Sequence, residues 1–247
     1  MYKTSHSGLG KKVNTSTIFF IPARAGSKGI PGKNLVHLNN RPLIEYTFEI
    51  IKKLSNHAYP FVSTDCTEVL SLASTFGFDT EYKRPSSLAQ DDSSIIDVVL
   101  HGIEWLKNSN KAKPATVVLF QPTSPLRTVD QVSEALQIFD AKKLESLVSV
   151  HEMREHPYEC SLGKDDDWSF VKEPSVNVVR RQDYSEKFYY IDGSIYMASV
   201  DFLLKNKSFL KAGETYLFET ESRFNIDIDE PEDLVVAEAL MKFRNNL

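Results

Sequence analysis

"FFIPARAGSKGIPGKN", Phe19–Asn34, decides the fold, because in it an apolar run leads directly into a loop rich in glycine and basic residues. A short apolar run that ends at a proline is typical of a buried strand. Gly26, Gly29 and Gly32 allow a tight turn whose N–H groups point at an anion. Full positive charges come from Arg24, Lys28 and Lys33. The stretch therefore predicts a strand followed by a loop that holds a phosphate-bearing ligand.

Strand-like and helical runs alternate further along the chain. The strand-like runs are rich in β-branched and aromatic residues; they are "STIFFIPA", "PFVSTD", "ATVVLFQP" and "ESLVSV". Between them, apolar residues recur at helical spacing in "PLIEYTFEIIKKL", "EVLSLASTFG", "SSIIDVVLHGIEWLKN" and "VDQVSEALQIFDAKK". This alternation predicts an α/β fold: a mostly parallel, Rossmann-like sheet with helices on both faces. Ligands of such sheets bind beyond the carboxyl ends of the strands.

The alternation stops near residue 151, where short strand-like pieces and turns replace the helices. We therefore expect a flexible leader at 1–16, an α/β core at 17–150, an inserted β-rich arm at 151–190 and a return to the core at 191–247. In the last part, "DGSIYMAS", "ETYLFET" and "RFNIDID" are predicted strands, and a closing helix begins at Pro231.

The composition of the 247-residue chain argues against several classes of protein. A formal net charge of −5 without a broad basic run argues against a general nucleic-acid binder. Cys66 and Cys160 lie far apart, so neither a zinc site nor a disulfide scaffold is indicated. Because no apolar run approaches the length of a membrane span, we expect no membrane partner and a cytoplasmic location.

The glycine-rich loop matches neither of two common phosphate-binding motifs. It contains no GxGxxG, and the interval from Gly26 to Gly32 exceeds the GxxxxGK[ST] spacing, with Asn34 where a hydroxyl should follow the lysine. Hydride transfer and a P-loop NTPase are therefore disfavoured. A solvated loop without a ligand remains the alternative, because glycine and lysine are common in such connections.

Two acidic residues near the C-terminus form a candidate metal site. Asp227 and Asp229 stand two apart in "NIDID", so in an extended run their carboxylates fall on one face and can approach one hard cation. Oxygen ligands without histidine suit Mg²⁺ or Mn²⁺. Capping of the helix that begins at Pro231 is the alternative, and it suits Asp229.

Six motifs occur in an order that resembles one known family: "IPARAGSKGIPGKN", "VSTD", "RPSSLAQDDSS", "LFQPTSPLR", "RRQ" and "NIDIDEPEDL". The chain is similar to the CMP–sialic acid synthetases, or N-acylneuraminate cytidylyltransferases, over about residues 17 to 243. The resemblance implies a reaction in which CTP and a 2-keto sugar acid give a CMP-sugar and pyrophosphate with a divalent cation, usually Mg²⁺. The anomeric hydroxyl of the sugar acid attacks the α-phosphate.

The resemblance also implies roles for individual residues. The implied nucleotide-binding residues are Arg24, Ala25, Gly26, Ser27, Lys33, Asn34 and Ser94. Ser93 is a second possibility for the last position, although we expect it to cap a helix. Arg24 and Lys33 would stabilise the leaving pyrophosphate, and Asp227 and Asp229 would bind the metal; these four are the implied catalytic residues.

For the sugar acid, the resemblance implies contacts from Gln121, Ser124, Arg127, Arg181 and Gln182. A planar guanidinium such as that of Arg181 can hold a carboxylate with two hydrogen bonds. Alternatively, Ser124 only shapes a turn between two prolines, and Arg181 forms an exposed ion pair. In the family the inserted arm is a dimerisation element, so a homodimer is implied.

One departure from the family pattern concerns the sugar pocket. Many sialic acid enzymes carry Arg-x-Asn-Gly where this chain has Tyr190 and Asp192 in place of the arginine and asparagine. The sugar thus stays open among N-acetylneuraminate, relatives such as legionaminate, and Kdo. Two other functions are considered: a sugar-1-phosphate nucleotidyltransferase and a non-catalytic nucleotide-binding protein, which would not need Asp227 and Asp229.

Overall fold

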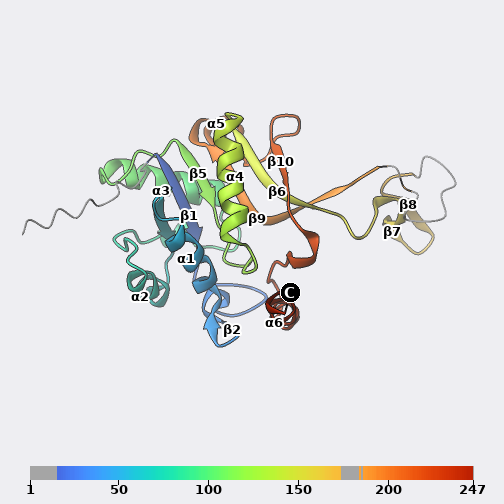
Figure 1. Cartoon of the computed structure of the whole chain (residues 1–247), viewed down its shortest axis with the longest axis horizontal. Coiled ribbons are helices and arrows are strands. Elements are labelled where there is room, and N and C mark those ends of the chain that lie inside the picture. Colours follow the sequence, from blue (N-terminus) through green and yellow to red (C-terminus); the bar gives the residue numbers. More distant parts are fainter. Residues whose placement is uncertain (1–15, 174–183, 185, 247) are drawn as a thin grey trace, which may run out of the picture.

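The computed structural model describes residues 16–173, 184 and 186–246, and its centre is a six-stranded sheet (Figure 1). The strand order is β10–β6–β9–β5–β1–β4. Only β9 runs antiparallel to its neighbours within this sheet, so the predicted mostly parallel sheet is confirmed. The strands are β1 (Thr17–Pro22), β4 (Tyr59–Ser63), β5 (Thr116–Leu119), β6 (Ser146–Glu152), β9 (Tyr189–Ser199) and β10 (Tyr216–Glu219).

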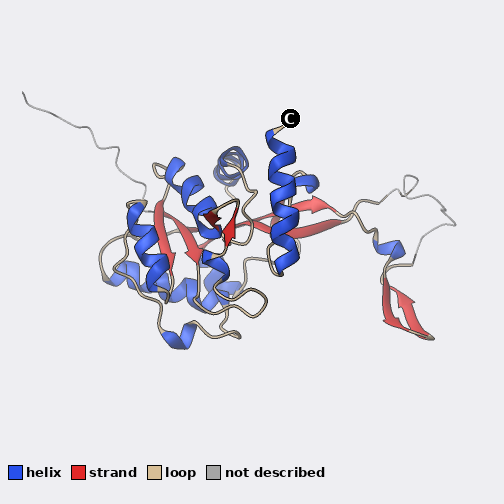
Figure 2. Ribbon diagram, turned by 90° about the horizontal axis from the view of Figure 1, so that it is seen from below, coloured by secondary structure: helices blue, strands red, loops and turns tan. Residues whose placement is uncertain are grey.

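Helices cover both faces of this sheet, as predicted (Figure 2). Successive side chains of a strand point to opposite faces, so Phe19 and Ile21 of β1 pack with α1, α2 and α4, whereas Ile18 and Phe20 pack with α3 and α5. The helices are α1 (Leu43–Lys53), α2 (Thr67–Thr75), α3 (Ile95–Asn108), α4 (Val129–Ala141) and α5 (Val200–Asn206). The continuous apolar run of β1 is therefore buried on both sides.

A smaller apolar cluster brings the C-terminal segment to the glycine-rich loop. Ile30 of that loop packs with Ile228 and with Ala237 of α6 (Pro231–Asn245). The short hairpin of β2 (His37–Leu38) and β3 (Arg41–Pro42) contributes to the same cluster through Leu38. Short 3₁₀ turns fill the connections at Lys33–Leu35, Ser86–Leu88, Pro157–Glu159 and Ser222–Phe224.

One predicted strand is wrong. "RFNIDID" contains a 3₁₀ turn followed by backbone outside any sheet, because Ile228 N–H donates to the carbonyl of Thr123 (2.9 Å) in a loop rather than in a strand. The alternation of exposure nevertheless persists, with Asp227 and Asp229 exposed on either side of buried Ile228. The two carboxylates still share a face, as the sequence predicts.

The β-rich insertion is visible in the described part of residues 151–190. It carries a hairpin of β7 (Ser161–Lys164) and β8 (Asp167–Phe170), which pair antiparallel in a sheet of their own. Figure 1 shows this hairpin standing away from the main body. After the arm, β9 begins at Tyr189 and re-enters the main sheet. None of the helices in the described residues is long and apolar enough to cross a membrane.

Candidate functional site

A pocket of about 240 Å³ lies at the carboxyl ends of β1 and β5, where the fold class predicts a ligand site. Its walls come from the glycine-rich loop, from the segment after β5 and from the stretch before α6. It brings together eight of the predicted site residues: Arg24, Gly26, Ser27, Lys33, Asn34, Gln121, Asp227 and Asp229. These residues span most of the chain in sequence.

Hydrogen bonds and close packing fix the glycine-rich loop. Ala25 N–H donates to Oδ1 of Asp65 (2.8 Å), and the amide of Asn34 donates to the carbonyl of Arg24 (3.0 Å). A Cβ on Gly29 would stand 2.2 Å from the carbonyl oxygen of Asp229, so only glycine allows this approach. Sequence reasoning missed Asp65, although its position just after β4 places it at the carboxyl edge of the sheet.

Lys33 and the two predicted metal ligands meet across the pocket. Nζ of Lys33 lies 2.7 Å from Oδ1 of Asp229. Glu230 is the N-cap of α6 and forms a capping box with Asp233, so the alternative role of Asp229 as the helix cap is wrong. Partial desolvation in the pocket raises the pKa of Asp227 above its usual value, and the charge of Asp229 adds to this effect.

This pair suits a hard divalent cation. Two carboxylates that face one pocket and repel each other gain from a shared positive charge. Within the described residues, no group of three or more histidine, cysteine, aspartate or glutamate side chains is arranged to hold a metal. Asp227 and Asp229 would therefore hold such a cation together with substrate oxygens and water, as is usual for Mg²⁺.

A second, smaller pocket adjoins the first and shares Pro22 and Arg24 with it. Arg84 lines it and is buried, and its guanidinium donates to the carbonyl of Ser63 (2.5 Å) and to the Ser63 hydroxyl (3.0 Å). Asp91 lines it too and forms an ion pair with Arg24. Neither Arg84 nor Asp91 was predicted as a site residue, although both lie in the motif "RPSSLAQDDSS".

Ser93 and Ser94 differ from the prediction in which of them caps helix α3. Ser94 is the N-cap of α3, and its hydroxyl accepts from Asp97 N–H (3.4 Å). Ser93, the expected cap, instead lines the second pocket and accepts from Gln90 N–H (3.0 Å). The prediction that Ser93 caps the helix is wrong because the helix begins at Ile95. The nucleotide contact of Ser94 stays a prediction.

Three predicted sugar-binding residues follow β5, but only Gln121 lines the pocket. Ser124 is buried, and its hydroxyl has no hydrogen-bond partner among the described residues. Arg127 is also buried, behind the pocket, where it donates to the carbonyls of Ser194 (2.6 Å) and Gln121 (2.9 Å). Burial lowers the pKa of Arg127 to about 9. Arg181 and Gln182 lie outside the described residues.

Asp192, which stands where many sialic acid enzymes have asparagine, has a structural role. Its carboxylate is buried and accepts hydrogen bonds from Ser194 N–H, the Thr220 hydroxyl and the Asn225 amide, each at 2.9 Å, and from Ser149. Asp192 thus ties together the ends of β6, β9 and β10 rather than facing a ligand. Tyr190 is exposed and lies beside His151, with ring centroids 5.6 Å apart.

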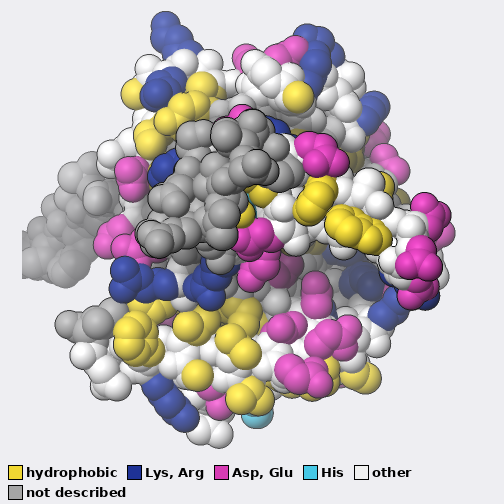
Figure 3. All heavy atoms as spheres, turned by 90° about the vertical axis from the view of Figure 1, so that its right-hand side faces the viewer, with side chains coloured by type: hydrophobic (Ala, Val, Ile, Leu, Met, Phe, Trp, Pro, Cys, Tyr) yellow, Lys and Arg dark blue, Asp and Glu magenta, His cyan; other side chains and the backbone are white. Residues whose placement is uncertain are grey.

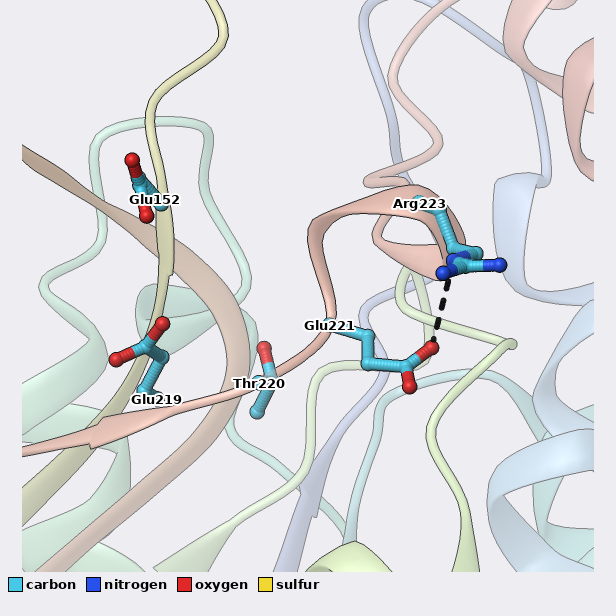
Figure 4. A pocket seen from close by; sticks show the side chains of 5 residues that line it. All are labelled: Glu152, Glu219, Thr220, Glu221 and Arg223. Atoms are coloured by element: carbon cyan, nitrogen blue, oxygen red, sulfur yellow. Dashed lines mark ion pairs between the residues drawn. The ribbon is translucent and has the colours of Figure 1, made fainter. Parts of the chain in front are cut away.

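Another cavity lies at the carboxyl ends of β6 and β10, shown in Figure 4. Its walls carry three acidic side chains and one arginine, which pairs with the nearest of them at 3.7 Å. They are Glu152, Glu219, Glu221 and Arg223, together with Thr220. The Thr220 hydroxyl also donates to the buried carboxylate of Asp192 (2.9 Å), and none of the residues that line this cavity was predicted as a site residue.

The fold and the site together define an α/β protein of the nucleotidyltransferase type. The defining features are the strand order, the helix layers and a glycine-rich loop opposite two carboxylates. Residues 18–246 match the family model described as cytidylyltransferase, and the chain belongs to this family. The family predicted from the sequence motifs is thereby confirmed.

Named relatives support this membership. The chain is 32% identical over 222 residues to a CMP-N,N'-diacetyllegionaminic acid synthase of Legionella pneumophila, covering 90% of this chain and 94% of the relative. It is 28% identical over 220 residues to an N-acylneuraminate cytidylyltransferase of Streptococcus agalactiae, covering 88% of this chain and 51% of the relative. The chain thus spans about half the length of the curated N-acylneuraminate cytidylyltransferases that it matches.

A solved structure shares the fold. A CMP:2-keto-3-deoxy-manno-octonic acid synthetase in complex with CTP superposes with a TM-score of 0.65 at 19% identity, covering 92% of this chain and 99% of that one.

Proposed function

We propose that the protein is a cytidylyltransferase that joins CTP to a nonulosonic acid, N-acetylneuraminate or a relative such as legionaminate, with release of pyrophosphate. The observation that carries this proposal is the pocket in which the cations of the glycine-rich loop face Asp227 and Asp229. Nucleotidyl transfer depends on positioning and on neutralising phosphate charge, and this pocket offers both.

The two adjoining pockets divide the nucleotide between them. The triphosphate occupies the pocket with Lys33 and the two aspartates, and the cytidine occupies the pocket with Arg84 and Ser93. Arg24 lines both and thus stands where base and phosphate halves meet. The second pocket, at about 170 Å³, is small, and this supports a pyrimidine base rather than a larger purine base.

In the proposed reaction, the anomeric oxygen of the sugar acid forms a bond to the α-phosphorus. The bond to the pyrophosphate oxygen breaks, and the hydroxyl proton leaves to solvent. Arg24 and Lys33 stabilise the negative charge of the leaving pyrophosphate. Gln121 lines the same pocket and would contact the sugar acid there. A Mg²⁺ or Mn²⁺ ion held by Asp227 and Asp229 would neutralise phosphate charge.

Pyrophosphate release tests this function and identifies the sugar. The purified protein, CTP and Mg²⁺ are incubated with N-acetylneuraminate, a legionaminate derivative, Kdo or no sugar acid. We expect release that depends on one nine-carbon acid. Release with Kdo alone would make the protein a CMP-Kdo synthetase, and release only with a sugar 1-phosphate and UTP would indicate the other nucleotidyltransferase class. Nucleotide binding without any release would favour a non-catalytic protein.

We further propose that the β7–β8 hairpin mediates a homodimer. Its exposed apolar side chains include Leu162 (70% exposed) and Trp168 (52%). Figure 3 looks at the arm end of the molecule and shows hydrophobic side chains at this surface. Exposed apolar groups of this size on a projecting element are typical of a protein interface.

Sedimentation tests the dimer. We expect the wild-type protein to sediment at twice the 28.1 kDa chain mass, and a Leu162→Ser, Trp168→Ser variant to sediment as a monomer. Leu204→Ser with Val235→Ser changes two equally exposed apolar residues on α5 and α6 and should leave the dimer intact. A monomeric wild type, or dimer loss in the control alone, would contradict this assignment.

A further inference from the structure

Arg24 separates the two pockets and is itself held by a carboxylate. It lines both, whereas Asp91 lines only the second. Nη1 of Arg24 pairs with Oδ1 of Asp91, and Nζ of Lys28 lies 3.6 Å from Oδ2 of the same carboxylate. Asp91 thus draws two cations of the glycine-rich loop toward the segment before α3.

Arg24 lines the pocket proposed for the triphosphate, and Lys28 belongs to the same loop. The Arg24 guanidinium donates a hydrogen bond to the Asp91 carboxylate, and this bond holds the pKa of Asp91 below its usual value. The carboxylate is therefore ionised at neutral pH and offers the loop the same kind of partner as a phosphate oxygen. The pair is partly exposed, at 29% for Arg24 and 44% for Asp91, so an incoming ligand can reach it.

Asp91 has few other contacts that would give it a structural role. Its carboxylate contacts two loop cations. Within the described residues it accepts no hydrogen bond from a helix or a strand. The adjacent Asp92 is exposed, and among the residues that the structure describes it forms no ion pair. The two neighbours therefore carry equal charge but differ in their contact with the loop.

We propose that Asp91 competes with the nucleotide's phosphates for Arg24 and Lys28 and thereby weakens their hold on the phosphates. This inference rests on the proposed function. A phosphate chain with several negative charges displaces the carboxylate from both cations, whereas a nucleoside without phosphate leaves the pair intact. When pyrophosphate leaves, Asp91 regains the cations, which weakens the hold on the remaining CMP-sugar.

Calorimetric titration tests this competition without any sugar acid. CTP and cytidine are titrated into the wild-type protein, Asp91→Asn and Asp92→Asn in Mg²⁺ and about 0.15 M salt, where exposed charges are screened beyond about 8 Å. We expect Asp91→Asn to bind CTP about two- to tenfold more tightly, as loss of two partly exposed ion pairs implies. Cytidine lacks the phosphates that compete with Asp91, so Asp91→Asn should change cytidine binding less than CTP binding, although Asp91 lines the pocket proposed for the cytidine. Asp92→Asn should gain less affinity for CTP than Asp91→Asn does.

A double-mutant cycle locates the effect. In a Lys28→Gln background, the gain from Asp91→Asn should shrink because one of the two competing pairs is already absent. Weaker CTP binding by Asp91→Asn would make Asp91 a ligand of the nucleotide and overturn the proposal. An equal gain in Asp92→Asn would reduce the effect to net charge and overturn it too. A wild-type protein that binds no CTP would contradict the proposed function itself.

Discussion

Asparagine at both 227 and 229 is expected to lower CTP- and metal-dependent turnover about a thousandfold, equivalent to ~4 kcal/mol of transition-state stabilisation. Asp227 and Asp229 line the same pocket, and the change would remove both charged oxygen ligands of the proposed divalent cation. Pyrophosphate release at saturating CTP and Mg²⁺ measures the effect. CTP binding measured without metal should survive, because the loop cations remain.

The melting temperature of the same variant provides a second test. The replacement relieves the desolvation of Asp227 and its repulsion by Asp229 but also removes the Lys33–Asp229 ion pair, so the melting temperature should change little. The matched control is Asp165→Asn with Asp166→Asn in the turn between β7 and β8, which removes the same charge away from the pocket. Asparagine accommodates the positive φ of Asp165 (55°). Full turnover in the Asp227, Asp229 variant would exclude these residues as metal ligands.

Arg127→Met is expected to destabilise the fold by roughly 3 kcal/mol and to lower the melting temperature by roughly 6–12 °C. The buried guanidinium donates to two backbone carbonyls and lies 4.8 Å from the centroid of the Phe120 ring. Methionine keeps the apolar contact but leaves the carbonyls of Ser194 and Gln121 without this donor. It also removes a positive charge that interacts with buried Asp192. Thermal and denaturant unfolding measure the loss.

Lysine at position 127 separates charge from geometry. Arg127→Lys keeps the positive charge but cannot reproduce a planar donor that reaches two carbonyls, so its loss of stability should be smaller than that of Arg127→Met. An unchanged melting temperature together with a raised KM for the sugar acid would instead support the direct substrate contact that the sequence predicts.

The sequence predicts the sheet and its helix layers because the spacing of apolar residues along the chain reflects which side chains are buried. Residues 18–21 in β1 and 117–120 around β5 are apolar at every position, as is typical of a short strand covered on both faces. The antiparallel direction of β9 leaves no such trace, since strand direction depends on how the chain re-enters the sheet after the arm. The same holds for the two-residue strands β2 and β3, which are too short for a periodic pattern.

The candidate site divides in the same way. The glycine-rich loop and the Asp227, Asp229 pair are each local in sequence, so residue type and spacing single them out as candidates, and the family resemblance favours a polyphosphate and a hard cation. Arg24 and Asp91 stand 67 positions apart, and only folding brings them together. The family resemblance places Arg127 in the sugar pocket and marks position 192 as a departure from the family pattern, whereas packing buries both side chains.

By itself, then, the sequence determined the fold class, the family and the chemistry that the loop and the acidic pair can perform. The tertiary structure alone decided which charged groups line the pockets and which hold the backbone in place. The physical reason is that the partners of a charged side chain, and its exposure to water, depend on contacts between distant segments that no local pattern records.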